Sequence, residues 1–355
     1  MNARRWVVAA LGVSLLAVGE ATAGPLGHAV AAAVREAGLG CRPRLRRCVT
    51  VVRVPVVPVM PRAEEVSLRF RFDKAPAYFA EITTETKQTM RVMGQEVVQT
   101  QLQKFLLRCT TEGMNEKGEG LLGIKIVGIA MNLDIGGVRI VVCGPGAGKP
   151  AGDPVSDLFR MMEGAELRFM IDPSDMSVQA IEGHEELIRK LSNTPAQMAP
   201  LVSSLVNKDA LTRMVAPLFD FAPLRALRPG DTWERQDVTN LGPIGNYRTR
   251  THNRYVGKSG AYEKIVTRRT LHYEAPKEPG GLPFTIRKAE LKSTSGDGVT
   301  LFEARRDRLV SADFEYVLEG KLTIDVGGME TDVELRQTQV SRVRVTDEKP
   351  RGWQR

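Results

Sequence analysis

The sequence has few of the residues from which metal and catalytic sites are usually built. Its 355 residues include four Cys, four His and three Trp, and only 6% are aromatic. His184, His252 and His272 are far apart in the chain and lack the paired spacing of metal ligands. The Gly-rich stretch 144–150 lacks the Ser or Thr that follows the lysine of a phosphate-binding loop, because Pro150 stands there. We therefore expect no metal, no cofactor and no enzymatic activity.

The sequence also lacks an apolar run long enough to cross a bilayer as a helix. The run Trp6–Val18 has 13 residues, or about 20 Å of helix, whereas the hydrocarbon core is about 30 Å thick. It follows two arginines and precedes small residues that end at Ala23, which is the pattern of a secretory signal peptide. We predict cleavage between Ala23 and Gly24, export to the periplasm or cell envelope, and a mature chain without a transmembrane span.

Seven of the eight units of net positive charge lie in the N-terminal 63 residues of the chain. Residues 24–63 hold seven Arg against one Glu, whereas residues 64–355 hold 41 basic and 40 acidic side chains. A nucleic-acid-binding domain needs an excess of basic charge on one face to displace counterions from phosphates. We therefore expect no nucleic-acid partner.

Residues 24–63 are predicted to form an Arg/Pro-rich flexible tether that follows the signal peptide of residues 1–23. Proline at every third position of Val54–Pro61 favours polyproline II over helix or a central strand. Cys41 and Cys48 lie in the same segment, and the sequence leaves open whether they form a disulfide or stay free.

From residue 64 the apolar pattern mostly has a period of two, which is typical of strands. Apolar and polar residues alternate over Leu68–Phe72, over residues 78–92 and over residues 312–326. At about 3.3 Å per residue, the two longer runs each span about 50 Å. Strands of this length do not stay flat, so we predict a long-stranded, strongly curved sheet or half-barrel.

Helical spacing appears only in the middle of the chain, mainly at about residues 184–221. Strands before and after it indicate an α+β, mainly antiparallel β fold rather than βαβ winding. We predict a single β-rich domain over residues 64–347, with a central helical insertion at about 184–221 and a C-terminal tail over residues 348–355.

Residues 133–138 and 324–329 share the pattern apolar-Asp-apolar-Gly-Gly-apolar. The Gly-Gly pairs supply the positive φ angles of tight hairpin turns. The similarity has two readings that the sequence leaves open, an internal duplication and convergent turn chemistry.

Two sets of candidate site residues lie in predicted strands. Arg248, Arg250, His252 and Arg254 alternate with uncharged residues and so share one face. That face is either an outer surface paired with acids such as Glu234 and Asp237, or a groove for an anionic ligand such as a lipid head group or an acidic glycan. Cys109 and Cys143 lie in neighbouring predicted strands and either form a disulfide or are buried thiols.

Several motifs carry a family resemblance, namely Leu68–Phe72, residues 92–97, residues 229–233, and residues 298–302 leading to 308–310. In these stretches residues 66–346 resemble a bacterial exported protein family of unknown function. The resemblance implies no functional residue. By element order alone the chain is also similar to the curved half-barrels that carry lipoproteins or lipids across the periplasm.

We therefore expect an exported, non-enzymatic envelope protein that binds a hydrophobic or amphipathic ligand, such as a lipid, in a curved β-sheet cavity. The low aromatic content favours a cavity, because few bulky side chains are available to fill a wide interior. Two alternatives stay open. One is a structural envelope domain with a filled core that binds a protein partner, and the other is a hydrolase whose site the sequence does not reveal.

Overall fold

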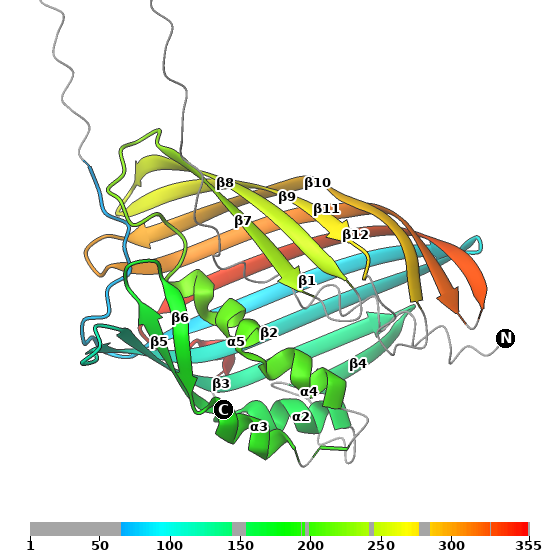
Figure 1. Ribbon diagram of the computed structural model, residues 1–355, viewed down its shortest axis with the longest axis horizontal. Coiled ribbons are helices and arrows are strands. Elements are labelled where there is room, and N and C mark those ends of the chain that lie inside the picture. Colours follow the sequence, from blue (N-terminus) through cyan, green and yellow to red (C-terminus); the bar gives the residue numbers. More distant parts are fainter. Residues whose placement is uncertain are drawn as a thin grey trace, which may run out of the picture.

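A computed structural model describes residues 65–143, 154–192, 194–195, 199–240, 245–276, 285–326 and 328–353. One antiparallel sheet of twelve strands dominates it and curls without closing (Figure 1). The strands are β1 Tyr78–Val92, β2 Gln95–Met114, β3 Gly120–Ile135, β4 Val138–Cys143, β5 Glu166–Asp172, β6 Ser177–Glu182, β7 Thr232–Asn240, β8 Asn246–Ser259, β9 Tyr262–Glu274, β10 Thr285–Glu303, β11 Arg308–Val326 and β12 Met329–Thr346. The helices are α2 Pro154–Met162, α3 His184–Leu191, α4 Ala199–Val206, α5 Lys208–Val215, η2 Ala216–Leu218 and η4 Arg351–Trp353.

The strand order is β6-β5-β3-β2-β1-β12-β11-β10-β9-β8-β7, with β4 paired to β3. Most neighbours in this order are also consecutive in the chain, because they are joined as hairpins. There are two exceptions in this order. β3 pairs with β5, with β4 between them in the chain, and the β1–β12 pair joins the two ends of the domain in the middle of the sheet. The prediction of a mainly antiparallel, strongly curved sheet of long strands is confirmed, and α3, α4, α5 and η2 lie within the predicted helical insertion.

The inner face of the curl carries apolar clusters at both ends of its strands. Ala80 and Ile82, near the start of β1, belong to a cluster that also takes in buried residues of α2, α3, α4 and α5. Met90 and Val92, at the other end of β1, belong to a second cluster with β8–β12. A third, smaller cluster around Phe302 lies at the same strand end as the first. The helices therefore cover one end of the inner face.

The C-terminal segment packs against the outer face. The indole Nε1 of Trp353 donates a hydrogen bond to Glu81 Oε2 at 2.5 Å, and the ring lies so close to Gly128 that a Cβ there would be 2.6 Å from it. Glu81, Leu106 and Gly128 are paired in register across β1, β2 and β3. The described part of the segment predicted as a C-terminal tail is thus docked on the sheet.

Candidate functional site

A row of polar side chains crosses the inner face between the apolar clusters. On one half of the sheet, Gln101 of β2 pairs with Thr86 of β1, and Thr86 pairs with Gln339 of β12. On the other half, Thr251 of β8 lies between Arg235 of β7 and Arg269 of β9. We call these residues and their buried neighbours the polar belt: Thr84, Thr86, Gln88, Gln99, Gln101, Gln103, Thr249, Thr251, Asn253, Tyr316, Gln337 and Gln339, with Arg235 and Arg269 half-buried.

The belt contains amide atoms that no described residue satisfies. Gln88 is fully buried, and neither its Nε2 nor its Oε1 has a hydrogen-bond partner among the described residues. Gln337 donates from Nε2 to the Tyr316 hydroxyl at 3.2 Å, but its Oε1 has no partner either. A buried polar atom left unpaired costs about 1–3 kcal/mol. Among the described residues these atoms are therefore destabilising unless water or a ligand pairs with them.

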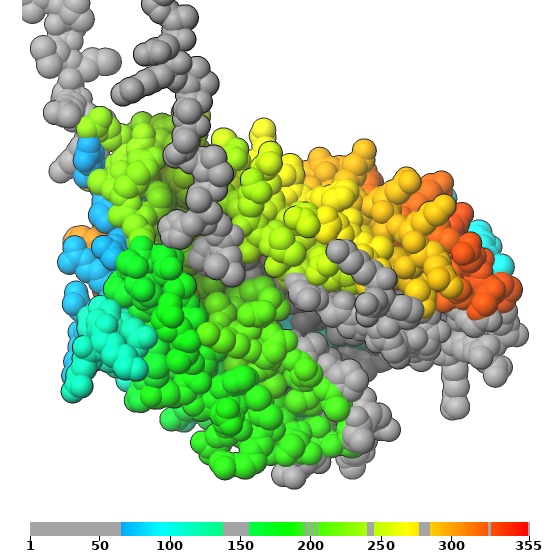
Figure 2. Space-filling view, in the orientation of Figure 1, coloured from blue at the N-terminus to red at the C-terminus, as the bar shows by residue number. Residues whose placement is uncertain are grey.

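An open cavity of about 800 Å³ lies next to the belt, between the helices and strands β7–β9. Figure 2 shows the helical segment (green) on the same side of the molecule as β7–β9 (yellow-green to yellow). The helical wall and the turn before β6 contribute Met176, Val178, Lys208, Asp209, Thr212, Arg213, Ala216 and Phe219. The strands contribute Asp237, Thr249 and Leu271, together with flanking residues of the same three strands.

Strand alternation decides which side chains point toward the helices. Arg235 donates to the main-chain oxygens of Asp220 and Ala222 and forms an ion pair with Asp220 Oδ1 at 2.8 Å. The face of β7 that carries Arg235 is therefore the face turned toward the helical segment. Asp237 lies two residues further on the same face. It pairs in register with Thr249 of β8, and Thr249 pairs with Leu271 of β9. These three side chains therefore form the strand wall of the cavity.

The predicted cationic stripe lies on the opposite, outer face. Arg248, Arg250, His252 and Arg254 alternate with buried residues and are all exposed. Arg248 forms an ion pair with Glu274, and His252 Nδ1 is 3.1 Å from Glu234 Oε1. The two pairs fit the interpretation of a paired outer surface, whereas Arg248 and Arg250 also border the cavity between the helices and β7–β9.

Burial and neighbouring charges perturb the titration of Asp237. Burial raises its pKa to about 6, the nearby carboxylate of Asp220 raises it as well, and Arg269, Arg235 and Arg213 oppose the rise. Burial also lowers the pKa of Arg213 on α5. The cavity wall thus holds a carboxyl group whose protonation changes near neutral pH.

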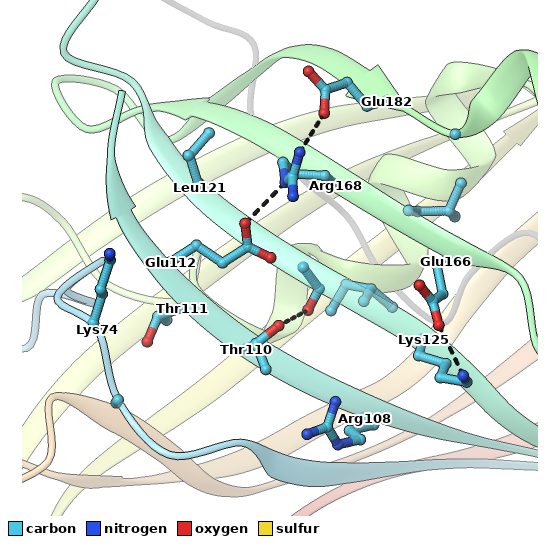
Figure 3. A pocket seen from close by; sticks show the side chains of 15 residues that line it. Lys74, Arg108, Thr110, Thr111, Glu112, Leu121, Lys125, Glu166, Arg168 and Glu182 are labelled. Atoms are coloured by element: carbon cyan, nitrogen blue, oxygen red, sulfur yellow. Dashed lines mark hydrogen bonds and ion pairs between the residues drawn. The ribbon is translucent and has the colours of Figure 1, made fainter. Parts of the chain in front are cut away.

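A second open cavity of about 800 Å³ lies on the outer face over β2, β3 and β5 (Figure 3). Its charged side chains are largely paired with one another. Arg168 bridges Glu112 at 2.9 Å and Glu182 at 2.7 Å, and Lys125 pairs with Glu166 at 2.7 Å. Because these pairs already satisfy most of its charge, this groove is a weaker candidate than the cavity beside the belt.

Of the two alternatives for Cys109 and Cys143, the disulfide is not formed. Cys109 is a free, buried thiol whose pKa burial raises well above its usual value. Cys109 pairs with Ile124 of β3, whereas Cys143 of β4 pairs with Met131, seven residues along the same strand. At about 3.3 Å per residue this is about 23 Å, far beyond the reach of a disulfide. Ala23, Gly24, Cys41 and Cys48 lie outside the described residues.

Sequence reasoning missed Asp237 and Arg213. It assigned Asp237 to the same outer face as Glu234. Their positions along β7 differ by three, and strand alternation puts residues at an odd offset on opposite faces. That alternation was the available signal. Arg213 had none, because only the packing of α5 shows which strands it meets. Among the described residues, no group of three His, Cys, Asp or Glu side chains is placed to hold a metal ion.

No family model matches the chain, and no curated protein matches it. A structure of lipovitellin, described for its lipid–protein interactions, shows 11% identity and a TM-score of 0.36 over 78% of this chain. The chain spans about a quarter (26%) of the length of that lipovitellin chain. DynF of Micromonospora chersina shows 8% identity over 82% of this chain and 91% of its own, with a TM-score of 0.17. OpdQ of Pseudomonas aeruginosa shows 6% identity over 76% and 99%, with a TM-score of 0.19. Similarities this low transfer no function to this chain.

Proposed function

We propose that the protein is a non-enzymatic binding protein that holds a small amphipathic ligand, such as a lipid, in the cavity between α5 and strands β7–β9. The observation that carries the proposal is the mixed lining of this cavity. Met176, Phe219 and Leu271 offer apolar surface, while Arg213 and Asp237 offer charge. Its volume of about 800 Å³ is within the range of ordinary small-molecule sites.

The neighbouring polar belt supports binding over a purely structural role. A domain whose interior only stabilises the fold gains nothing from a fully buried glutamine with two unpaired amide atoms. Gln88 is such a residue. It does not line the cavity itself, and a ligand that extends along the belt, or water that accompanies it, would supply the missing partners.

The proposed location is the periplasm or cell envelope. It rests on the signal-peptide pattern of residues 1–23, which lie outside the described part of the chain. N-terminal sequencing of the protein from the envelope fraction should begin at Gly24, and intact Met1 on protein from the cytosol would contradict export. None of the described helices is long and apolar enough to cross a membrane.

The binding proposal is tested by filling the cavity. Thr212 of α5 lines it, so Thr212→Trp should block it, whereas the matched exchange Thr100→Trp places the same ring on an exposed position of β2. Native mass spectrometry of protein purified without detergent should show a bound small molecule on the wild type and on Thr100→Trp. Thr212→Trp should lack it and should not enhance the fluorescence of 1-anilinonaphthalene-8-sulfonate.

Equal dye binding by Thr212→Trp and Thr100→Trp, both folded by circular dichroism, would place the ligand elsewhere. A bare polypeptide mass and no dye binding by the wild type would refute a binding function altogether.

Hydrolysis is a second candidate, favoured by a single observation. Asp237 has a pKa of about 6, which suits a general acid or base near neutral pH. Release of products from ester substrates, lost in Asp237→Asn, would favour this candidate. Recovery of intact ligand after prolonged incubation would favour binding.

A further inference from the structure

Arg213 carries a half-buried guanidinium on the helical wall of the cavity. It lies on α5 in the wall of the cavity, and no hydrogen bond or ion pair with another described residue is formed by it. A guanidinium carries five N–H donors and stays charged in proteins. Burial opposes this charge, as the lowered pKa of Arg213 indicates. A group of this kind is stabilised when an anion enters its site.

The other charged groups around Asp237 are engaged elsewhere. Arg235 of β7 is paired with Asp220, which follows η2. Arg269 of β9 lies over the ring of Phe314, 4.1 Å from its centroid. At the cavity edge, Lys208 donates to the main-chain oxygen of Gln179 at 2.8 Å. Arg250 of β8 also borders the cavity, but strand alternation puts its side chain on the outer face with Arg248. Among the described residues on the helix side, Arg213 is therefore the cation left for a ligand, and Asp237 is the carboxylate of the strand wall.

Asp209 is the remaining charged group beside Arg213. It lies in the first turn of α5, is exposed, and attracts the guanidinium without forming an ion pair with it. His272 borders the cavity too, but its side chain is on the outer face with Arg248. Neither group is placed to replace Asp237 as the carboxyl that faces a ligand in the interior.

We propose that Arg213 and Asp237 form the subsite for an anionic head group, a carboxylate or a phosphate, and that Asp237 takes up a proton when this group binds. The inference rests on the proposed function and names the ligand class as a single-chain anionic amphiphile. The head group is held at Arg213, and the chain lies against Phe219 and Leu271 on the cavity wall.

The proton uptake follows from electrostatics. An anion at Arg213 repels the carboxylate of Asp237 and so favours its neutral form. The pKa of Asp237 is about 6 without ligand, and the bound anion moves it upward. Between pH 6 and 8 the complex therefore binds more protons than the free protein, and affinity falls as pH rises. A pKa change of about one unit corresponds to about a tenfold change in affinity.

The test uses decanesulfonate, whose head group does not titrate, so that any pH dependence comes from the protein. With a bound pKa of Asp237 one unit higher than the free value, isothermal titration should show about fivefold tighter binding at pH 6 than at pH 8. Asp237→Asn, which keeps the shape of the side chain, should bind at pH 8 as the wild type does at pH 6. Decanoate and decyl phosphate, compared at pH 8, show which head group the subsite prefers.

Arg213 is tested by charge and by position. Arg213→Gln should lose the preference for decanesulfonate over the neutral decanol by tenfold or more, and Arg213→Lys should recover part of it. Arg254→Gln, on the exposed outer face of β8 and away from the cavity lining, is the matched control and should bind like the wild type.

The outcomes separate the two proposals. If decanol and decanesulfonate bind equally and Arg213→Gln changes neither, the head-group subsite is wrong while the binding function stands. If Asp237→Asn keeps the pH dependence, the proton uptake is wrong. If none of the amphiphiles binds the folded wild type, both proposals fail.

Discussion

Replacing Gln88 by Met should stabilise the ligand-free protein, although it alters a fully buried residue in the middle of the sheet. Gln88 lies between Gln99 and Gln337 in register, and both of its amide atoms lack partners among the described residues. Methionine has a similar length and no amide to desolvate. An unpaired buried polar group costs about 1–3 kcal/mol, and the variant should recover a gain of this size.

The matched control is the same exchange at Gln339 of β12, two residues from Gln337, which is the register partner of Gln88. Gln339 accepts a hydrogen bond from the Tyr316 hydroxyl at 2.9 Å, and both residues are buried. Gln339→Met leaves this hydroxyl without its acceptor and should cost about 1–3 kcal/mol. The same substitution thus has opposite signs at two positions of one belt.

Urea unfolding of delipidated protein, followed by circular dichroism, measures both effects as shifts of the midpoint at constant slope. A destabilised Gln88→Met would refute the reasoning, because the amide would then be satisfied in the folded protein without a ligand. Decanesulfonate should narrow the gap between Gln88→Met and the wild type if the bound ligand or its water contacts the amide.

Three further predictions concern the C-terminal segment, the free thiol and the cavity carboxyl. Trp353→Ala should lower the free energy of unfolding by about 3 kcal/mol, because it exposes the sheet around Gly128 and leaves Glu81 without its indole donor. An unchanged urea midpoint would contradict the docking of Trp353 on the sheet. Cys109 is buried and its pKa is raised, so peptide mapping after iodoacetamide treatment should show this thiol labelled only in unfolded protein. Labelling under native conditions would contradict its burial. Burial of Asp237, which raises its pKa from the ordinary value of 3.8 to about 6, destabilises the fold progressively as pH rises between these two values. Asp237→Asn should therefore match the wild type at pH 3.5 and exceed it in stability at pH 7, and an equal difference at both pH values would contradict the shift.

Local patterns determined much of the architecture. Alternation over residues 78–92 and 312–326 predicted β1 and β11, and the structure has strands there with one buried face. The length of these runs was enough to predict curvature, because side-chain sterics twist every strand and the twist accumulates with length. The Gly-Gly pairs predicted the β3–β4 and β11–β12 turns, where Gly136, Gly137 and Gly328 have positive φ.

Only the tertiary structure decided which face of each strand is enclosed and which residues meet there. A period of two separates the faces of β7 and β8 without saying which is covered, so the cationic stripe and Asp237 were assigned to one surface. The packing of the helices against β7, through the Arg235–Asp220 pair, put Asp237 inside and Arg248 outside. Pairing between distant strands likewise separated Cys109 from Cys143 and aligned Gln88 with Gln337. Such contacts depend on register and on chain segments far apart in sequence, and a local pattern carries no information about either.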